Sequence, residues 1–141
     1  MKLYNKHSAA EEIKNNERTA LQLLEQASYQ EGVTLLQEVV DKQKIIYGTD
    51  DESRVNNLCT LQWGYWKVND KRQAEKTARE ALEIRERTRG LDHPLTLDIM
   101  GRIADNLCHQ GRKVECDLMH HEIKSREMNR SKALGAEKQL K

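Results

Sequence analysis

The chain has 141 residues, and its 24 Lys and Arg side chains nearly balance 23 Asp and Glu side chains, for a formal net charge of +1. A nucleic-acid-binding surface needs a clustered positive excess, so we expect no nucleic acid among the partners. Only 37% of the residues are hydrophobic and Phe is absent, which excludes a thick sandwich or barrel core and favours thin apolar layers in an all-α fold.

The first two predicted helices cover the N-terminal third of the chain. Helix one runs from about Ala9 to Ser28, because Ser8–Glu11 has the spacing of a capping box. Helix two carries a broad apolar stripe at helical spacing and ends at Gly48. The polar run Thr49–Asp51 then offers caps for a third helix.

Three further helices follow in the same manner. The fourth opens at Asp70 and ends at Gly90, and Asp92 caps the fifth, which has Pro94 in its first turn. The sixth runs from about Arg112 to Leu134 and grows polar toward its end, as expected of a terminal helix without a following neighbour. Its predicted packing residues are Val114, Cys116, Leu118 and Ile123.

The helices belong to an internal repeat, because residues of similar size recur 42 positions apart. A column of small residues and several apolar columns share this single register, which chance does not readily produce. The columns include Gly48 and Gly90; Gly32, Ala74 and Cys116; and Thr19, Leu61 and Ile103.

The repeat sets the expected domain organisation. One repeat domain, made of three two-helix units, is flanked by a short extension and a polar tail. The predicted boundaries are 1–8 for the N-terminal extension, 9–134 for the repeat domain with units of about 9–48, 49–90 and 91–134, and 135–141 for a flexible tail.

Two segments are specific enough to suggest a family. Ala81–Glu86 reads Ala-Leu-Glu-Ile-Arg-Glu, and Gly90–Pro94 reads Gly-Leu-Asp-His-Pro. Together they resemble the 42-residue tetratricopeptide repeats of kinesin light chains and their relatives. The resemblance implies a right-handed α-solenoid of about three tetratricopeptide-type helix pairs. It departs from the family where paired asparagines are usual, since Cys59–Thr60 and Gly101–Arg102 occupy those positions.

The resemblance also implies a function. We expect a protein–protein interaction module that binds a partner segment in the concave groove of a short helical-repeat array. A structural arm from a larger array, which oligomerises or senses and self-associates through exposed end layers, remains an alternative. The chain lacks a Gly-rich phosphate loop, G-x-S-x-G and H-E-x-x-H, so we expect neither an enzyme nor a cofactor.

In such an array the first helix of each unit lines the groove. Two tryptophans there either anchor a peptide or cover the neighbouring helices, and both interpretations stay open. A nearby arginine could receive an acidic peptide, although a solvated charged face is the simpler and preferred explanation. The candidate partner-binding residues are Asn56, Cys59, Trp63, Trp66, Lys67 and Arg102.

A second constellation surrounds the last helical hairpin. Cys116 and His120 lie four residues apart on one helix face, and the hairpin could bring Cys108 toward them, a donor set that zinc accepts. However, the column of small residues explains Cys116 as a packing residue. We therefore expect no metal site and keep a metal-binding hairpin as the third alternative.

Cysteine usage and hydropathy bear on the compartment. Cys59, Cys108 and Cys116 form an odd and sparse set, which is typical of free thiols in a reducing compartment. No run approaches about 18 apolar residues, and the first residues lead into polar sequence without a secretory core. We expect a cytoplasmic protein that does not bind membranes.

Overall fold

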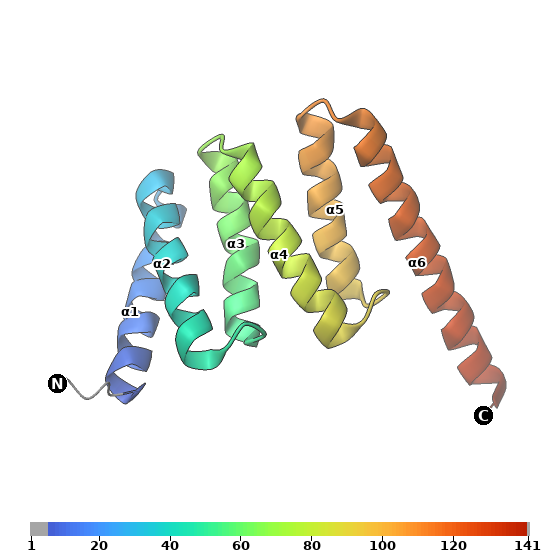
Figure 1. Cartoon of the computed structure of the whole chain (residues 1–141), viewed down its shortest axis with the longest axis horizontal. Coiled ribbons are helices and arrows are strands. Elements are labelled where there is room, and N and C mark those ends of the chain that lie inside the picture. The colour runs from blue at the N-terminus through green and yellow to red at the C-terminus, as the bar shows by residue number, and fades with distance from the viewer. Residues whose placement is uncertain (1–5, 141) are drawn as a thin grey trace. The chain divides into compact units, whose positions relative to one another are not determined.

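The computed structural model describes residues 6–140, and within that range the chain forms six α-helices and no strand (Figure 1). This confirms the all-α prediction. Residues 1–5 of the predicted N-terminal extension lie outside the described range. The helices are α1 (Lys6–Glu25), α2 (Tyr29–Tyr47), α3 (Glu52–Lys67), α4 (Lys71–Arg89), α5 (Pro94–His109) and α6 (Lys113–Leu140).

The helix boundaries repeat with the period of the sequence. The second helices α2, α4 and α6 begin at equal intervals along the chain, and the first helices α1, α3 and α5 end at that same interval. The turn inside each pair contains a left-handed residue at the same register, namely Ala27, Asn69 and Gly111. Ala is costly in this conformation and Gly is not, so the first turn carries backbone strain that the third avoids.

Three predicted features of the boundaries of α1 and α5 need correction. α1 begins at Lys6, so Ser8 lies inside the helix rather than capping it, and α1 ends at Glu25 rather than Ser28. For α5 the cap is His93, whose Nδ1 accepts from the Leu95 amide at 3.1 Å, rather than Asp92. By contrast, Asp51 and Asp70 do accept backbone amide hydrogens at the starts of α3 and α4.

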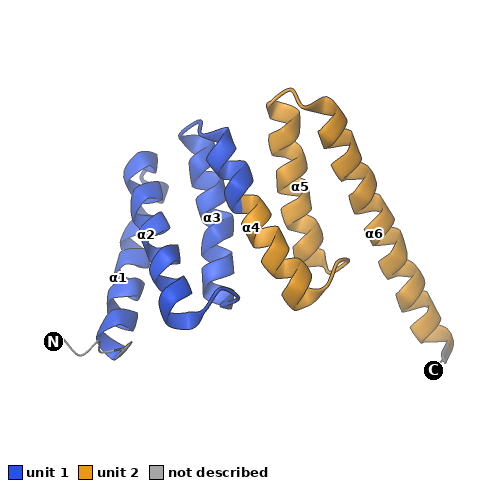
Figure 2. Cartoon of the chain, in the orientation of Figure 1, with its two compact units in different colours: residues 1–77 blue, residues 78–141 orange. Residues whose placement is uncertain are grey.

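The chain divides into two compact units, residues 1–77 and residues 78–141, with the division inside α4 (Figure 2). Unit 1 contains α1, α2, α3 and the start of α4, and its helices pack closely where side chains are small. A Cβ built on Gly64 of α3 would lie 2.7 Å from a methyl group of Val33, and one on Gly32 of α2 would lie 2.8 Å from Leu24. These glycines therefore permit the close crossings.

A buried polar network joins the three complete helices of unit 1. The Asn57 amide donates to Glu17 of α1 at 2.9 Å and to Gln43 of α2 at 3.2 Å, and Gln43 donates to Ser53 at 3.2 Å. Each of these buried amides is thus hydrogen-bonded, as burial requires. Asn57 is buried and therefore has a packing role, whereas its neighbour Asn56 is exposed.

Arg54 is the largest buried side chain of unit 1, only 2% exposed. Its Nε donates to the Val40 carbonyl at 3.0 Å and its Nη1 to the Thr49 carbonyl at 2.9 Å. The Val40 carbonyl belongs to α2 and the Thr49 carbonyl to the turn between α2 and α3. The arginine thereby ties the α2–α3 turn to α3.

Unit 2 packs the end of α4 against α5 and α6. Its core confirms the small-residue column, since Cys116 is fully buried, as Gly32 and Ala74 are in unit 1. Arg126 of α6 donates to Glu86 of α4 at 2.9 Å and to the Leu91 carbonyl at 3.1 Å. Other buried apolar residues of unit 2 are Ala78, Ala81, Ile84, Ile99, Met100, Ile103, Ala104 and Leu107.

The last helix differs from its prediction. Val114 and Leu118 are 74% and 64% exposed, so these two predicted packing residues do not pack. α6 also continues through residues 135–140 instead of ending at about Leu134. Among the described helices, none combines the length and apolar character that a membrane span requires.

In the first repeat, Thr19 is exposed, so it departs from the buried column of Leu61 and Ile103.

Candidate functional site

The face of α3 carries five of the six predicted partner-binding residues. Asn56 and Lys67 are exposed, whereas Cys59 and Trp66 are half-buried. Trp63 is 40% exposed, which is unusual for so large an apolar ring. The structure therefore leaves accessible surface on this face, which lies wholly in unit 1.

Trp63 belongs to a group of three side chains that we call the aromatic cluster: Tyr29, Trp63 and Lys67. The two rings meet edge to face, with centroids 5.7 Å apart and planes at 81°. The Lys67 ammonium lies 5.4 Å from the Trp63 ring centroid and 6.0 Å from that of Tyr29. Both arrangements are favourable for aromatic quadrupoles and hold Trp63 in place while part of its ring faces solvent.

Trp66 has a partner of its own. The Lys71 ammonium, at the start of α4, lies 5.5 Å from the Trp66 ring centroid. The α3 face thus presents two indole rings, each with a lysine beside it. Such a surface is apolar at the rings and positive at its border, a combination suited to an acidic segment that also carries an apolar side chain.

Sequence reasoning missed Tyr29 and Lys71. Both residues begin second helices, whereas the family resemblance places the groove on the first helix of each unit. The repeat register could have indicated them, because Tyr29 and Lys71 occupy the same position in successive units. Each lies immediately after an intra-repeat turn, and that turn brings it beside α3.

Arg102, the sixth predicted residue, belongs to α5 in unit 2. It is exposed, and its Nε forms an ion pair with Asp98 of the same helix at 3.3 Å. An exposed pair of this kind contributes little to stability. The ion pair with Asp98 therefore supports the interpretation of Arg102 as part of a solvated charged face.

Unit 2 contains an open pocket of about 300 Å³. Arg126 borders it and is held by Glu122 and Glu86 at 3.0 and 2.9 Å. Burial opposes the charged form of Arg126, but its hydrogen bonds with Glu122 and Glu86 outweigh burial and raise its pKa. The positive charge of Arg126 is thus balanced by two carboxylates of the protein itself. The pocket is lined by Arg79, Leu82, Met100, Leu107, Glu115, Leu118, Met119, Glu122 and Arg126.

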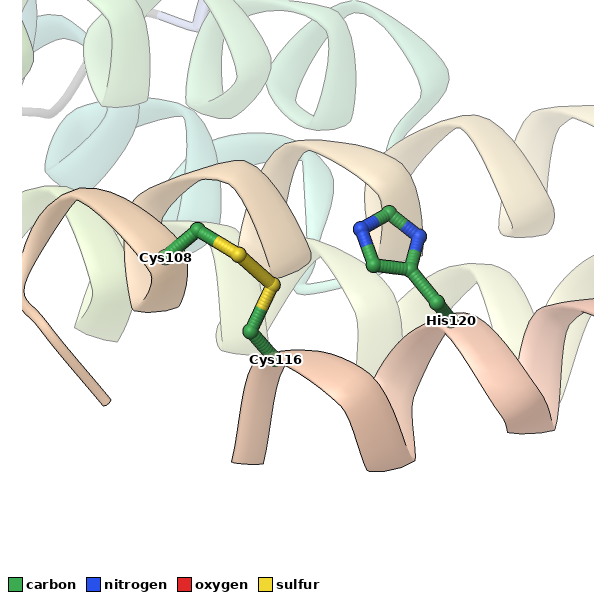
Figure 3. Close-up of side chains that lie close together, drawn as sticks. All are labelled: Cys108, Cys116 and His120. Carbon is green, nitrogen blue, oxygen red and sulfur yellow. A yellow bond between two sulfur atoms is a disulfide. The ribbon is translucent and has the colours of Figure 1, made fainter. Parts of the chain in front are cut away.

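The cysteines correct the prediction of three free thiols. Cys108 and Cys116 form a disulfide across the α5–α6 turn, with Cα atoms 5.3 Å apart. The prediction failed because the turn places the last turn of α5 beside the first turn of α6, within disulfide range. Cys59 lies outside this bond. His120 lies beside the pair (Figure 3).

Comparison with known proteins adds to this geometry. A family model described as "Tetratricopeptide repeat" matches residues 64–95. A comparison with curated proteins found no match. The matched segment covers the end of α3, all of α4 and the turn into α5, which includes both segments that carried the family resemblance.

Solved structures match over most of the chain. One contains nearly identical TPR-like repeats of a Podosopora anserina protein of kinesin light chain type, with 19% identity, a TM-score of 0.72, and coverage of 83% of this chain and 56% of that one. A variant of the same protein matches at 18% identity, TM-score 0.72, and 85% and 57% coverage. BtubC (BKLC) from P. vanneervenii matches at 12% identity, TM-score 0.71, and 83% and 46% coverage.

The chain thus spans about half the length of the solved structures that it matches. Structural matches at such low sequence identity establish the fold alone. They agree with the repeat segment that the family model matches independently. The predicted fold class, an α-solenoid of tetratricopeptide-type helix pairs, is confirmed. Residues 64–95 match the tetratricopeptide repeat model, and the chain has the fold of solved TPR-like repeats of kinesin light chain type.

Proposed function

We propose that the chain binds a segment of a partner protein on the α3 face, through the aromatic cluster and Trp66. Tetratricopeptide repeats generally mediate protein–protein interactions, which supports the general class of function. The observation that carries the specific site is the partial exposure of Trp63, 40%, despite its contacts with Tyr29 and Lys67.

The cluster is preorganised for binding. Two aromatic rings and a lysine already hold one another, so a partner need not order Trp63 on arrival, and the entropic cost of binding falls. Lys67 and Lys71 supply positive charge beside the rings. The partner segment accordingly carries an apolar side chain next to acidic residues. Binding presents a surface and involves no chemical step.

The cytoplasm is part of this proposal. Disulfides are rare in reducing compartments, so a cytoplasmic chain would hold Cys108 and Cys116 mainly as thiols. In that setting the Cys108–Cys116 bond is exposed to cellular thiols, which makes it reversible rather than permanent.

Selection of peptides on the folded chain tests the proposal. Peptides selected from a random library on the wild type are measured against Trp63→Ala, and Ile45→Ala serves as the control because Ile45 is 80% exposed in the same unit. Loss of an interface anchor should weaken binding at least about fivefold, or ~1 kcal/mol, without changing the helicity. Equal losses of peptide affinity in both variants would reject the site. A loss of binding that appears only under conditions in which the Trp63→Ala variant unfolds would also reject it.

A second function is favoured by α6. Val114, Leu118 and Met128 are 74%, 64% and 58% exposed and, at 100° per residue, fall on one side of the helix, away from Cys116. An exposed apolar stripe on an end layer suits stacking on another repeat or a second copy. Sedimentation velocity over a hundredfold concentration range tests this function. Self-association abolished by Leu118→Lys supports it, and a constant monomer rejects it.

A further inference from the structure

Three metal-binding side chains converge at the α5–α6 hairpin. The donor atoms of Cys108, Cys116 and His120 all lie within 4.8 Å of one another. Figure 3 shows Cys108 at the end of α5 joined to Cys116, with the His120 ring projecting from the same side of α6 as Cys116. Four residues separate Cys116 from His120, slightly more than one helical turn, which explains their shared direction.

Packing accounts for only one member of this group. In the repeat register, Cys116 corresponds to Gly32 and Ala74, both buried small residues. His120, however, corresponds to Leu36 and Ala78, which are 0% and 2% exposed. An exposed imidazole therefore replaces a core residue in the last repeat alone.

The same contrast holds for Cys108. Its counterparts in the repeat register are the buried Leu24 and the half-buried Trp66, whereas Cys108 is exposed. A disulfide explains the two cysteines but gives His120 no role. A shared ligand explains all three residues.

We infer that the reduced hairpin binds a zinc ion through Cys108 Sγ, Cys116 Sγ and one His120 ring nitrogen. Zinc prefers thiolate and imidazole donors, with Zn–S of about 2.3 Å and Zn–N of about 2.0 Å, which places tetrahedral donors roughly 3.5 Å apart. The observed cluster is within reach of that spacing. Three protein donors leave the fourth position for water.

The disulfide and the metal exclude each other. A dithiol reductant transfers two electrons and two protons to the Cys108–Cys116 bond, which yields two thiols and the oxidised, cyclic form of the reductant. Zinc then displaces one proton from each thiol and bonds to both thiolates. Reduction therefore opens the site, and oxidation by another disulfide closes it.

The environment of the two cysteines permits this exchange. Cys116 is fully buried, whereas Cys108 and His120 are exposed. Rotation of the Cys108 side chain separates the sulfur atoms without moving the core around Cys116, and both reductant and metal reach the hairpin from the Cys108 side. Zinc would fasten α5 to α6 in place of the disulfide.

Cobalt(II) is the probe for this site, because its thiolate bonds produce charge-transfer absorption in the near ultraviolet. The full chain, reduced with a phosphine under argon, should bind one equivalent of Co²⁺ with that absorption, and Zn²⁺ should displace it. The oxidised chain should show none. His120→Gln should weaken Co²⁺ binding at least about tenfold, since even supporting residues around metals reach that effect.

Matched variants separate the site from its alternatives. Cys116→Ala keeps the small packing residue and Cys108→Ser changes an exposed side chain, so both should fold and both should lose the thiolate absorption. His121→Gln and Cys59→Ser should bind like the wild type. The proposal is overturned if the reduced wild type shows no thiolate band at one equivalent, or if His120→Gln retains wild-type affinity.

Discussion

At the scale of single residues, Tyr65 shows how burial changes the chemistry of one side chain. Its hydroxyl donates to Gln37 at 2.7 Å. Burial first, and then the nearby carboxylates of Asp70 and Asp41, raise the pKa of Tyr65 above its ordinary value of 10.0. All three effects oppose the phenolate, so the folded chain holds the proton more tightly than the unfolded chain does.

This pKa shift predicts a pH dependence of stability. Tyr65 contributes stability that is fully present below about pH 10 and is lost as the pH rises through its folded-state pKa, because only the unfolded chain then ionises freely. The free-energy difference between wild type and Tyr65→Phe in urea unfolding should be constant from about pH 7 to 9 and decline above 10. Parallel curves for wild type and Tyr65→Phe would contradict the shift.

Residue patterns in the sequence predicted burial better than polar contacts. Ala74 and Cys116 were identified as packing residues by their columns and are fully buried. Arg54 was not identified, because an arginine in a sequence carries no sign that two backbone carbonyls will satisfy it. Such partners come from α2 and the turn after it, and only folding brings them within 3.0 Å.

At the scale of the helix, close crossings depend on residues without side chains. α3 contains Gly64 and α5 contains Gly101, and both are helical. A Cβ on Gly64 would meet Val33 at 2.7 Å, whereas one on Gly101 would meet nothing within 4 Å. Val33 is 1% exposed and stiff at its branched Cβ, so it cannot move aside cheaply.

Alanine at the two glycines should therefore have opposite effects. Gly64→Ala should destabilise the chain by about 1–3 kcal/mol through overpacking. Gly101→Ala should stabilise it by about 0.5–1 kcal/mol, because glycine is a poor helix former and nothing obstructs the new methyl group. Urea denaturation of both variants beside the wild type measures the two shifts. A neutral Gly64→Ala would mean that the α2–α3 crossing is looser than described.

At the scale of the whole molecule, the last helix has two parts with different roles. Its first half contributes Cys116 and the half-buried Ile123 to unit 2, and Arg126 ties it to Glu86. Beyond that point, the described side chains from 131 to 139 are all exposed. Burial thus predicts that only the first half supports the fold.

Truncation tests this division. Deleting residues 135–141 should change stability by less than about 0.5 kcal/mol, since it removes exposed groups. Deleting residues 113–141 should expose Met100, Ile103 and Leu107 of α5 and cause aggregation or unfolding, as followed by size-exclusion chromatography and thermal melting. If the shorter fragment stayed soluble, monomeric and cooperatively folded, the sixth helix would be an appendage and the three-pair architecture would be wrong.

The sequence by itself determined the helical class, the repeat period, the positions of most turns and the small-residue column. These features follow from local propensity and from spacing along the chain, both of which a sequence displays directly. Five of the six candidate binding residues could also be placed on one helix from spacing alone.

Only the tertiary structure decided which residues meet. Tyr29 and Trp63 belong to different helices far apart in the chain, and their rings touch because α2 folds back beside α3. The turn after α5 likewise brings together two cysteines that were predicted to be free. They form a disulfide, and His120 lies beside it. Spacing indicates the direction in which a side chain leaves its own helix. Its partner is set by the packing of neighbouring helices, which sums many weak contacts distant in sequence.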